Sequence, residues 1–526
     1  MKEIAVAKID DLQDGQTKQV EVEDSALLLA KIDGQIYATG AYCTHYGAPL
    51  AKGVSCNKTV VCPWHNACFD LTSGEQLEPP GLNDLPKYKV RIEGEDIYVA
   101  IPEEIQSQRM PEMAQQNKSA DDRTMVVLGA GIAGVNAVET LRKKGYQGKI
   151  VMVSAEEKLP YDRTKLSKAY LQGQADEDSL AMRSCEFYEQ NDIELLFART
   201  VTKLDSKSKC LTFQDGSSIS YDKLLIATGG KARKLDVPGS DLANIFTVRQ
   251  PEDVNSILKT VKNAQKALVI GSSFIGMEAA ASLIQQGLEV TVVSSDNVPF
   301  KKILGDKLGK MFQQVHEEKG VSFIFGTKAK EFKGDSSVTA AMLENGDTIE
   351  TDLVILGIGV QPNTNFVEGI ELNEKDSSVP VNEYLQSEQS DVYGAGDIAR
   401  FPYAPMGEAT RIEHWRLAAQ HGRIAAVNML AGNTQAADNI VPFFWSGQYD
   451  LKLRYVGHAE EWDELHIDGD LDKPEFLAFY LQNNKVMAVA GINRDKDIAA
   501  ISQLMRDKSM PEAATVKQTS DWVEKL

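Results

Sequence analysis

Two glycine-rich segments of similar form, about 142 residues apart, constrain the fold of this 526-residue chain more than any other feature. The two segments read Gly129-Ala-Gly131-Ile-Ala-Gly134 and Gly271-Ser-Ser273-Phe-Ile-Gly276. An apolar run precedes each segment, and a helical pattern and a second apolar run follow it. This order of strand, glycine-rich turn, helix and strand is typical of the βαβ unit that binds a dinucleotide. The duplication therefore predicts two α/β units.

The first segment has the residues that a dinucleotide site needs. Gly129, Gly131 and Gly134 allow a tight turn and a close approach of the backbone to a pyrophosphate. The N-terminus of the following helix stabilises the phosphate charge. Glu156 comes 22 residues after Gly134, at the end of the second strand, where a carboxylate can accept a hydrogen bond from a ribose hydroxyl.

The second segment departs from this pattern at two places. Ser273 replaces the middle glycine between Gly271 and Gly276, which predicts a looser approach to the pyrophosphate. Asp296 follows the second strand and could serve NADH. Side chains that could accommodate the extra phosphate of NADPH stand beside it, namely Ser294, Ser295, Lys301 and Lys302. The sequence favours NADH and leaves NADPH open.

Cysteine and histidine form a separate pattern near the N-terminus. Cys43-Thr-His45 is followed, after sixteen residues, by Cys62-Pro-Trp-His65, so each of two loops offers one thiol and one imidazole. A zinc finger usually pairs cysteines in one loop and histidines in the other. A Rieske 2Fe-2S cluster needs one cysteine and one histidine from each loop. One iron is bound by the two thiolates, and the second iron is bound by the two imidazoles. The pattern therefore favours this cluster over zinc or an empty site.

The two loops resemble those of the Rieske family, and their neighbours predict a low cluster potential. High-potential members of that family join the two loops by a disulfide and place hydroxyl groups near the cluster sulfurs. Ala48 and Trp64 stand at the disulfide positions here, and Ala67 and Phe69 at the hydroxyl positions. Fewer hydrogen bonds to sulfur lower the potential. Asn66 replaces a glycine that is usual in the family, and it puts the fine geometry of the loop in doubt.

Composition limits the partners and the compartment. The net charge of −20 argues against nucleic acid and anionic membranes as main partners. No run approaches the ~18 apolar residues of a membrane-spanning helix. The N-terminus lacks the apolar core of a signal peptide, so the expected compartment is the cytoplasm.

The flanks of the α/β region have a different character. Residues 1–104 contain short apolar runs separated by glycine and proline, which predicts an all-β domain. The polar stretch 105–122 reads as a linker or a short packed helix. Residues 441–526 contain strand patterns and an amphipathic helix at about 497–506, which predicts a C-terminal α+β domain with an interface or dimerisation role. The sequence is compatible with a homodimer.

Two further motifs resemble those of the flavoproteins with two dinucleotide-binding domains. They are Ala227-Thr228-Gly229-Gly230, before the second glycine-rich segment, and Gly394-Ala-Gly396-Asp397, well after it. The resemblance implies FAD in the first unit, with Asp397 near its ribityl chain, and NADH or NADPH in the second. It also implies that the NAD(P)H-binding domain, 249–374, is inserted in a split FAD-binding domain, 123–248 and 375–440.

One branch of that family fits best. Disulfide reductases carry a cysteine pair after the first unit, and this chain has none there. Its Pro160-Tyr-Asp-Arg163 and Leu166-Ser-Lys168 resemble the signature of ferredoxin reductases and apoptosis-inducing-factor-like oxidoreductases. The resemblance implies that Arg163 and Arg233 contact FAD and that Lys168, paired with Glu278, lies beside the flavin. The alternative is an ordinary ion pair.

Aromatic residues complete the predicted flavin site. In the same branch, the helix that starts near His414 and Trp415 directs its N-terminus at the flavin, where negative charge develops on reduction. Trp445 is predicted near the flavin or, equally, as a core residue.

The whole chain resembles Rieske-domain-containing apoptosis-inducing-factor-like oxidoreductases. A nicotinamide delivers two electrons as hydride, flavin can pass them on singly, and a 2Fe-2S cluster accepts one at a time. The expected function is an FAD-dependent NAD(P)H reductase that passes electrons through its own cluster to an unidentified protein acceptor, for example an oxygenase. Two alternatives stay open, namely a self-contained enzyme with a small acceptor such as a quinone, and a redox-responsive signalling protein.

Overall fold

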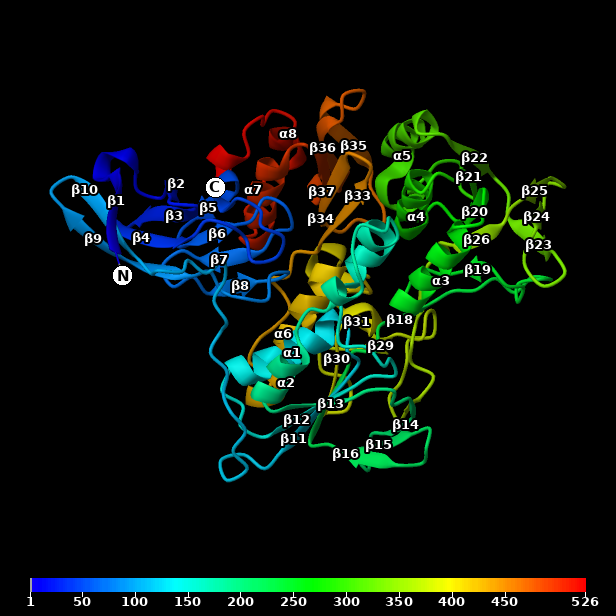
Figure 1. Ribbon diagram of the computed structural model, residues 1–526, viewed down its shortest axis with the longest axis horizontal. Helices are drawn as coiled ribbons and strands as arrows, with labels where there is room; N and C mark the ends of the chain where they lie inside the picture. Colours follow the sequence, from blue (N-terminus) through cyan, green and yellow to red (C-terminus); the bar gives the residue numbers. More distant parts are fainter. Residues whose placement is uncertain (1) are drawn as a thin grey trace.

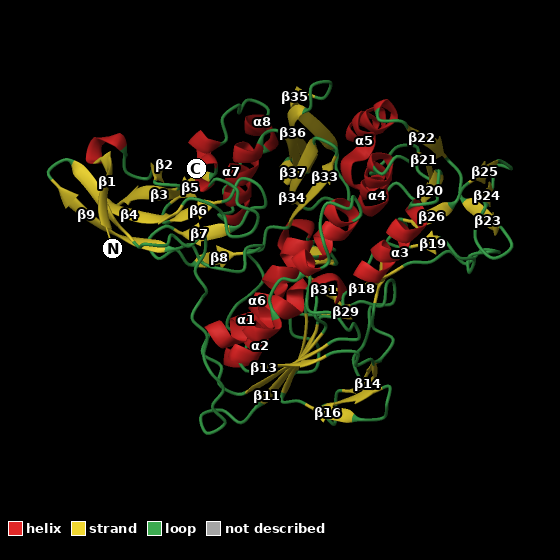
Figure 2. Ribbon diagram, in the orientation of Figure 1, coloured by secondary structure: helices red, strands yellow, loops and turns green. Residues whose placement is uncertain are grey.

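The computed structural model describes residues 2–526 and contains four structural units. An all-β unit lies at one end of the molecule, coloured blue in Figure 1, and two α/β units and a C-terminal β-rich unit make up the rest. Figure 2 shows the helices gathered between the sheets of these units. Within residues 2–526, no helix is both long and apolar enough to cross a lipid bilayer.

The N-terminal unit has two antiparallel sheets. The larger has the order β1-β10-β9-β4-β3-β2, and the smaller has the order β5-β6-β7-β8. Their strands are β1 (Lys2–Lys8), β2 (Thr17–Val22), β3 (Ser25–Ile32), β4 (Gln35–Gly40), β5 (Val54–Cys56), β6 (Thr59–Val61), β7 (Cys68–Asp70), β8 (Gln76–Glu78), β9 (Lys87–Glu93) and β10 (Asp96–Ile101). Alternate residues of β3 enter two cores, because successive side chains of a strand point to opposite faces.

The first α/β unit contains a parallel sheet of order β13-β12-β11-β17-β30. Its strands and helices are β11 (Thr124–Leu128), α1 (Ile132–Lys143), β12 (Lys149–Val153), α2 (Cys185–Gln190), β13 (Ile193–Leu196), β17 (Lys223–Ile226), β30 (Val392–Gly394) and α6 (Trp415–Ala431). Four of the five residues of β11 are buried, as expected for a parallel strand that is covered on both faces. A side sheet adds β14 (Val201–Asp205), β15 (Cys210–Phe213), β16 (Ser218–Ser220) and β28 (Val367–Glu368).

The second α/β unit repeats this plan with the order β19-β26-β20-β21-β22. It consists of β19 (Ile245–Phe246), α3 (Pro251–Val261), β20 (Lys266–Ile270), α4 (Phe274–Gln285), β21 (Glu289–Ser294), α5 (Lys301–Glu318), β22 (Val321–Phe325) and β26 (Leu353–Leu356), with a side sheet of β23 (Ala329–Lys333), β24 (Ala340–Leu343) and β25 (Thr348–Glu350). Short strands between the units are β18 (Gly230–Ala232), β27 (Val360–Pro362), β29 (Val379–Pro380), β31 (Ala399–Tyr403) and β32 (Glu408–Thr410). The parallel strands of this unit precede β30 in the sequence and follow β17.

The C-terminal unit is an antiparallel sheet of order β33-β34-β37-β36-β35 with helices on one side. Its elements are β33 (Phe443–Gln448), β34 (Leu451–Gly457), β35 (Glu464–Asp470), β36 (Glu475–Gln482), β37 (Lys485–Ile492), α7 (Asp495–Arg506) and α8 (Ala513–Val516). The expected amphipathic helix at 497–506 corresponds to α7. Residues 102–123 contain no helix or strand, and Arg109 makes a single bridge to Asp84.

The N-terminal and C-terminal units share a hydrophobic core. Val54 and Val61 of the smaller sheet pack with Phe443, Ile498 and Trp522, all of which are buried. Figure 1 shows β5 to β7 beside α7. This shared core holds the two Cys/His loops against the rest of the chain, because one loop runs from β4 to β5 and the other from β6 to β7.

Candidate functional site

One large cavity, of about 1580 Å³, lies between the two α/β units and the C-terminal unit. The predicted cofactor-binding residues that line it are Gly129, Gly131, Glu156, Arg163, Lys168, Thr228, Gly229, Gly271, Ser273, Glu278, Asp296, Gly396, Asp397, His414, Trp415 and Trp445. Gly134, Gly276 and Arg233 do not line it. The fold therefore brings both glycine-rich segments to a single space.

The three glycines of the first segment have different surroundings. A Cβ on Gly129 would lie 2.2 Å from the Ala227 carbonyl oxygen, and φ is +120° there. A Cβ on Gly134 would lie 2.0 Å from the Gly129 carbonyl oxygen, so this glycine lets helix and strand pack closely. Gly131 has open space where its Cβ would be. This open position faces the cavity at the start of α1 and fits a pyrophosphate.

Ser273 in the second segment has a local structural role. It is the N-cap of α4, and its Oγ accepts a hydrogen bond from the Gly276 N–H. The same hydroxyl donates to the Gly357 carbonyl at 2.7 Å. Serine is a favoured N-cap residue, so the departure from glycine stabilises the helix start at the cavity wall.

A buried ion pair lies at the wall of the cavity. The Lys168 Nζ is 2.7 Å from Glu278 Oε2, and the Glu278 side chain is only 3% exposed. Ser167 also donates to Oε2, and Ser446 donates to Oε1 at 2.7 Å. Glu278 therefore accepts from three side chains that come from two other units, which exceeds what an ordinary surface ion pair offers.

The four predicted metal ligands form two facing pairs. The Nδ1 atoms of His45 and His65 lie 3.0 Å apart. Burial lowers the pKa of His45 to about 4 and that of His65 well below its usual value, so both imidazoles are neutral, as ligation requires. Burial raises the pKa of the Cys62 thiol, but hydrogen bonds from the Cys43 thiol and from N–H groups of its own loop outweigh burial and hold that pKa below its usual value. Two pairs fit a two-iron cluster in which each iron takes one pair.

Asn66 suits the backbone conformation of the loop that carries His65. Asn66 has φ +62°, a left-handed conformation that asparagine tolerates better than most residues. Its side-chain amide donates to Ser502 Oγ at 2.5 Å, which ties the loop to α7. Ala67 and Phe69 are fully buried beside this loop. The low cluster potential that these apolar side chains suggest stays a prediction.

Trp445 joins the two regions. Its ring centroid lies 4.4 Å from that of His65 and 5.9 Å from that of His45. The same side chain lines the large cavity. An aromatic ring therefore separates the cavity from the two histidines.

Three family descriptions match the chain. Residues 123–422 match the pyridine nucleotide-disulphide oxidoreductases, residues 2–89 match the Rieske [2Fe-2S] domain, and residues 443–526 match the reductase C-terminal domain. The chain belongs to the pyridine nucleotide-disulphide oxidoreductase family. This oxidoreductase is an FAD-dependent NAD(P)H enzyme that carries a Rieske 2Fe-2S domain.

Its relatives match the chain over different shares of its length. It is similar to apoptosis-inducing factor 3 of Mus musculus, with 36% identity over 96% of this chain and 84% of the relative. Putidaredoxin reductase CamA of Pseudomonas putida is 33% identical over 73% of this chain and 92% of its own. The crystal structure of the covalent putidaredoxin reductase–putidaredoxin complex matches with a TM-score of 0.72 and 30% identity, over 77% of this chain and 97% of the other.

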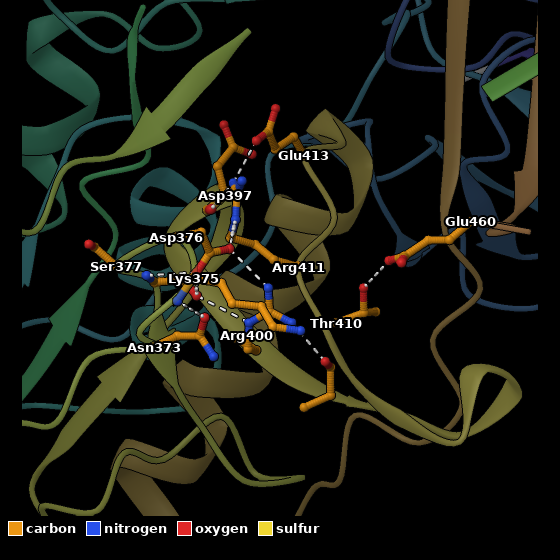
Figure 3. Close-up of polar contacts among 12 residues, drawn as sticks. Asn373, Lys375, Asp376, Ser377, Asp397, Arg400, Thr410, Arg411, Glu413 and Glu460 are labelled. Carbon is orange, nitrogen blue, oxygen red and sulfur yellow. Dashed lines mark hydrogen bonds and ion pairs between the residues drawn. The ribbon is translucent and has the colours of Figure 1, made fainter. Parts of the chain in front are cut away.

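Sequence reasoning missed several charged residues of the oxidoreductase that line the cavity. The Arg249 guanidinium is 3.6 Å from the Asp397 carboxylate, and Arg163 donates to the Arg249 carbonyl. Figure 3 shows Arg411 between Asp376 and Glu413, close to Asp397. Arg249 and Asp376 stand outside the motifs, whereas Arg411 and Glu413 directly precede the predicted His414 and Trp415.

The charge network in Figure 3 fixes the Arg411 side chain. Its Nε is 2.9 Å from Asp376 Oδ2, and its Nη1 donates to the Asp397 carbonyl at 3.0 Å. Burial raises the pKa of Asp376, but hydrogen bonds from Ser378 and ion pairs with Arg400 and Arg411 outweigh it and hold the pKa below its usual value. Asp376 therefore stays ionised and holds Arg411 at the cavity.

Two predicted residues have notable surroundings in this oxidoreductase. The Nδ1 atom of His414 is buried and has no partner within residues 2–526, and the residue lines the cavity. Such an orphaned donor or acceptor fits a site that is completed by a bound cofactor. Arg233 is exposed, and its Nε donates to the Val360 carbonyl at 3.0 Å.

Proposed function

We propose that this oxidoreductase passes electrons from NAD(P)H through FAD to its own Rieske cluster and on to an external protein acceptor. The observation that carries the proposal is the position of Trp445. Its ring lines the cavity on one side and contacts both histidines of the N-terminal unit on the other. This packing places the cavity wall directly against the two histidines, which supports a short path for an electron between the two regions.

The proposal assigns each cofactor to residues. Cys43, His45, Cys62 and His65 would hold the cluster. The first glycine-rich unit, with Glu156, Arg163 and Asp397, would hold FAD, and the second unit would bind NAD(P)H. The strand order supports a split FAD-binding domain, because β30 pairs with β17 across the intervening second unit. Bound FAD would accept hydride from NAD(P)H and release electrons singly.

Polar contacts support a stable position of the N-terminal unit on the reductase units. Arg183 forms a buried ion pair with Glu139 at 2.8 Å and donates to Asn83 Oδ1 at 2.6 Å. The fully buried Arg416 lies 3.2 Å from Glu78 Oε2. The ion pair with Glu139 holds Arg183 within the first α/β unit, and the contacts that cross to the N-terminal unit are those with Asn83 and Glu78.

A covalent connection has a kinetic advantage. The solved complex named above joins putidaredoxin reductase to a separate protein, putidaredoxin. Residues 102–123 connect the N-terminal unit to the reductase units in this chain. A tether raises the effective concentration of the attached domain to the millimolar range, on the order of that for short flexible linkers. We infer that residues 2–101 take the place of a diffusing redox partner.

Replacement of Trp445 by alanine tests the proposal. We expect electron passage from flavin to cluster to slow by about ten-fold or more, because the packed ring between the cavity and the histidines is lost. Flavin reduction by NADH should change by less than about two-fold. Stopped-flow absorbance under anaerobic conditions follows both steps.

Two matched variants control for packing. Trp445→Phe keeps an aromatic ring and should retain most of the rate. Trp462 packs on Tyr480 in the C-terminal unit, away from the histidines, and Trp462→Ala should leave cluster reduction unchanged. Cluster reduction at the native rate in Trp445→Ala would show that electrons do not need this contact.

A further inference from the structure

A chain of buried side chains leads away from the Lys168–Glu278 pair into the C-terminal unit. Ser446 Oγ lies 2.7 Å from Glu278 Oε1, and Gln448 Nε2 lies 2.9 Å from Ser446 Oγ. Gln448 Oε1 lies 2.8 Å from His316 Nε2. The Tyr449 hydroxyl is 3.4 Å from His316 Nδ1.

We propose that Ser446, Gln448 and His316 are positioning residues that orient Glu278 toward Lys168, an inference that rests on the proposed function.

The direction of the donors follows from the chemistry of each group. The side-chain amide of Gln448 has a carbonyl oxygen that accepts and an NH2 group that donates. Since its Oε1 faces the His316 Nε2, its Nε2 donates to Ser446, and the Ser446 hydroxyl proton is left to donate to Glu278. Every donor in the chain therefore points toward the carboxylate.

Burial makes this direction costly to change. His316 is 0%, Gln448 1%, Ser446 2% and Glu278 3% exposed. Burying a polar group without a hydrogen bond costs free energy, so each member must keep its partner. Burial also lowers the pKa of His316 to about 4, and the neutral ring carries its proton on Nε2, where it donates to Gln448. Apolar side chains could fill the same space without needing hydrogen-bond partners, so the polar groups here specify one arrangement of the side chains.

The chain divides the two oxygens of Glu278 between different tasks. Oε1 accepts from Ser446, and Oε2 accepts from Lys168 and Ser167. Without Ser446, the carboxylate could rotate, and Lys168 would lose its fixed position at the cavity. A fixed cation at that wall stabilises negative charge on a bound flavin.

The members come from separate parts of the fold. Glu278 lies on α4 and His316 on α5, whereas Ser446 and Gln448 lie on β33. Residues 446 and 448 share one face of that strand, and Trp445 points to the other face. Neither Gln448 nor His316 lines the cavity, so any effect of these two residues on flavin must pass through Glu278.

Ser446→Ala and Gln448→Leu test the inference in the FAD-loaded enzyme. We expect each variant to slow flavin reduction by NADH by roughly 3- to 10-fold, the scale of a lost buried hydrogen bond. The flavin midpoint potential should become more negative, and the FAD absorption spectrum should change in both variants. Ser446→Thr keeps the hydroxyl and should restore all three properties.

Two reference variants separate the explanations. Tyr480 is also fully buried in this sheet and donates to the Leu304 carbonyl at 3.1 Å, so Tyr480→Phe reports on a lost buried hydroxyl outside the chain. Its rate and potential should stay at native values. If Glu278→Gln shifts the reduction rate and the flavin potential while Ser446→Ala and Gln448→Leu shift neither, the hydrogen-bonded row of side chains only fills space, and the inference is wrong. If Glu278→Gln shifts neither property, the Lys168–Glu278 pair does not act on the flavin and the inference is wrong, whereas electron transfer from flavin to cluster, measured separately, still decides the proposed function.

Discussion

Replacement of His65 by alanine is expected to abolish cluster assembly while FAD stays bound. The side chain is buried, and its Nδ1 lies 3.0 Å from that of His45, so its loss leaves one iron with a single imidazole. The large cavity is lined only from Leu128 onward within the described residues 2–526. Iron, sulfide and flavin contents of the purified variant measure the result directly.

The kinetics of this variant locate the cluster in the electron path. NADH should reduce the flavin at a near-native rate, because the wall of the cavity is unchanged. Transfer to cytochrome c, used as a one-electron protein acceptor, should fall by about 100-fold, which corresponds to about 2.7 kcal/mol in the barrier. Ferricyanide is small enough to take electrons at the flavin and should be much less affected.

A matched histidine controls for general effects of the substitution. His466 lies half-buried on β35, with its ring 6.1 Å from that of Phe479, and His466→Ala should keep both cluster and turnover. If cytochrome c turnover survives the loss of the cluster in His65→Ala, residues 2–101 are not on the main path. A small acceptor such as a quinone would then become the better explanation.

The Lys168–Glu278 pair should show the second large effect. We expect Lys168→Ala and Glu278→Gln each to slow flavin reduction by about ten-fold, because either change leaves a largely buried partner without its opposite charge. The double variant should lose less than the product of the two, since residues in direct contact couple. Stopped-flow rates of flavin reduction by NADH measure all three.

An exposed ion pair supplies the control. Lys266 and Glu350 are 2.8 Å apart, with side chains that are 43% and 77% exposed. Surface pairs contribute about 0–1 kcal/mol, so Lys266→Ala should change the rate by less than about two-fold. If flavin reduction by NADH proceeds at the native rate in both Lys168→Ala and Glu278→Gln, the buried pair has only a structural role.

Local patterns allowed much of the fold to be predicted. The glycines at 129 and 134 predicted the tight turn correctly, because a Cβ at either position would collide with a carbonyl oxygen. The Cys/His loops are equally local, since each loop carries its own thiol and imidazole. Ser273 and Asn66 looked like departures, and their roles as N-cap and as left-handed loop residue explain them.

Contacts between distant segments could not be predicted in the same way. Trp445 meets His65 across 380 positions of sequence, and Asn66 meets Ser502 across 436. No periodicity or spacing encodes such pairs, because they depend on how complete units pack. Arg249 was missed for the same reason. Arg233, which the family resemblance placed against FAD, is exposed and bonded to the Val360 carbonyl.

The central claim is that electrons from NAD(P)H reach the cluster of the same chain. Rapid mixing of the oxidised protein with NADH in the absence of oxygen, followed by freezing and electron paramagnetic resonance, detects the reduced cluster directly. The account predicts a Rieske signal that forms after flavin reduction and within the turnover time, at a rate independent of protein concentration. A flavin that is reduced by NADH while the cluster stays oxidised through many turnovers would contradict it.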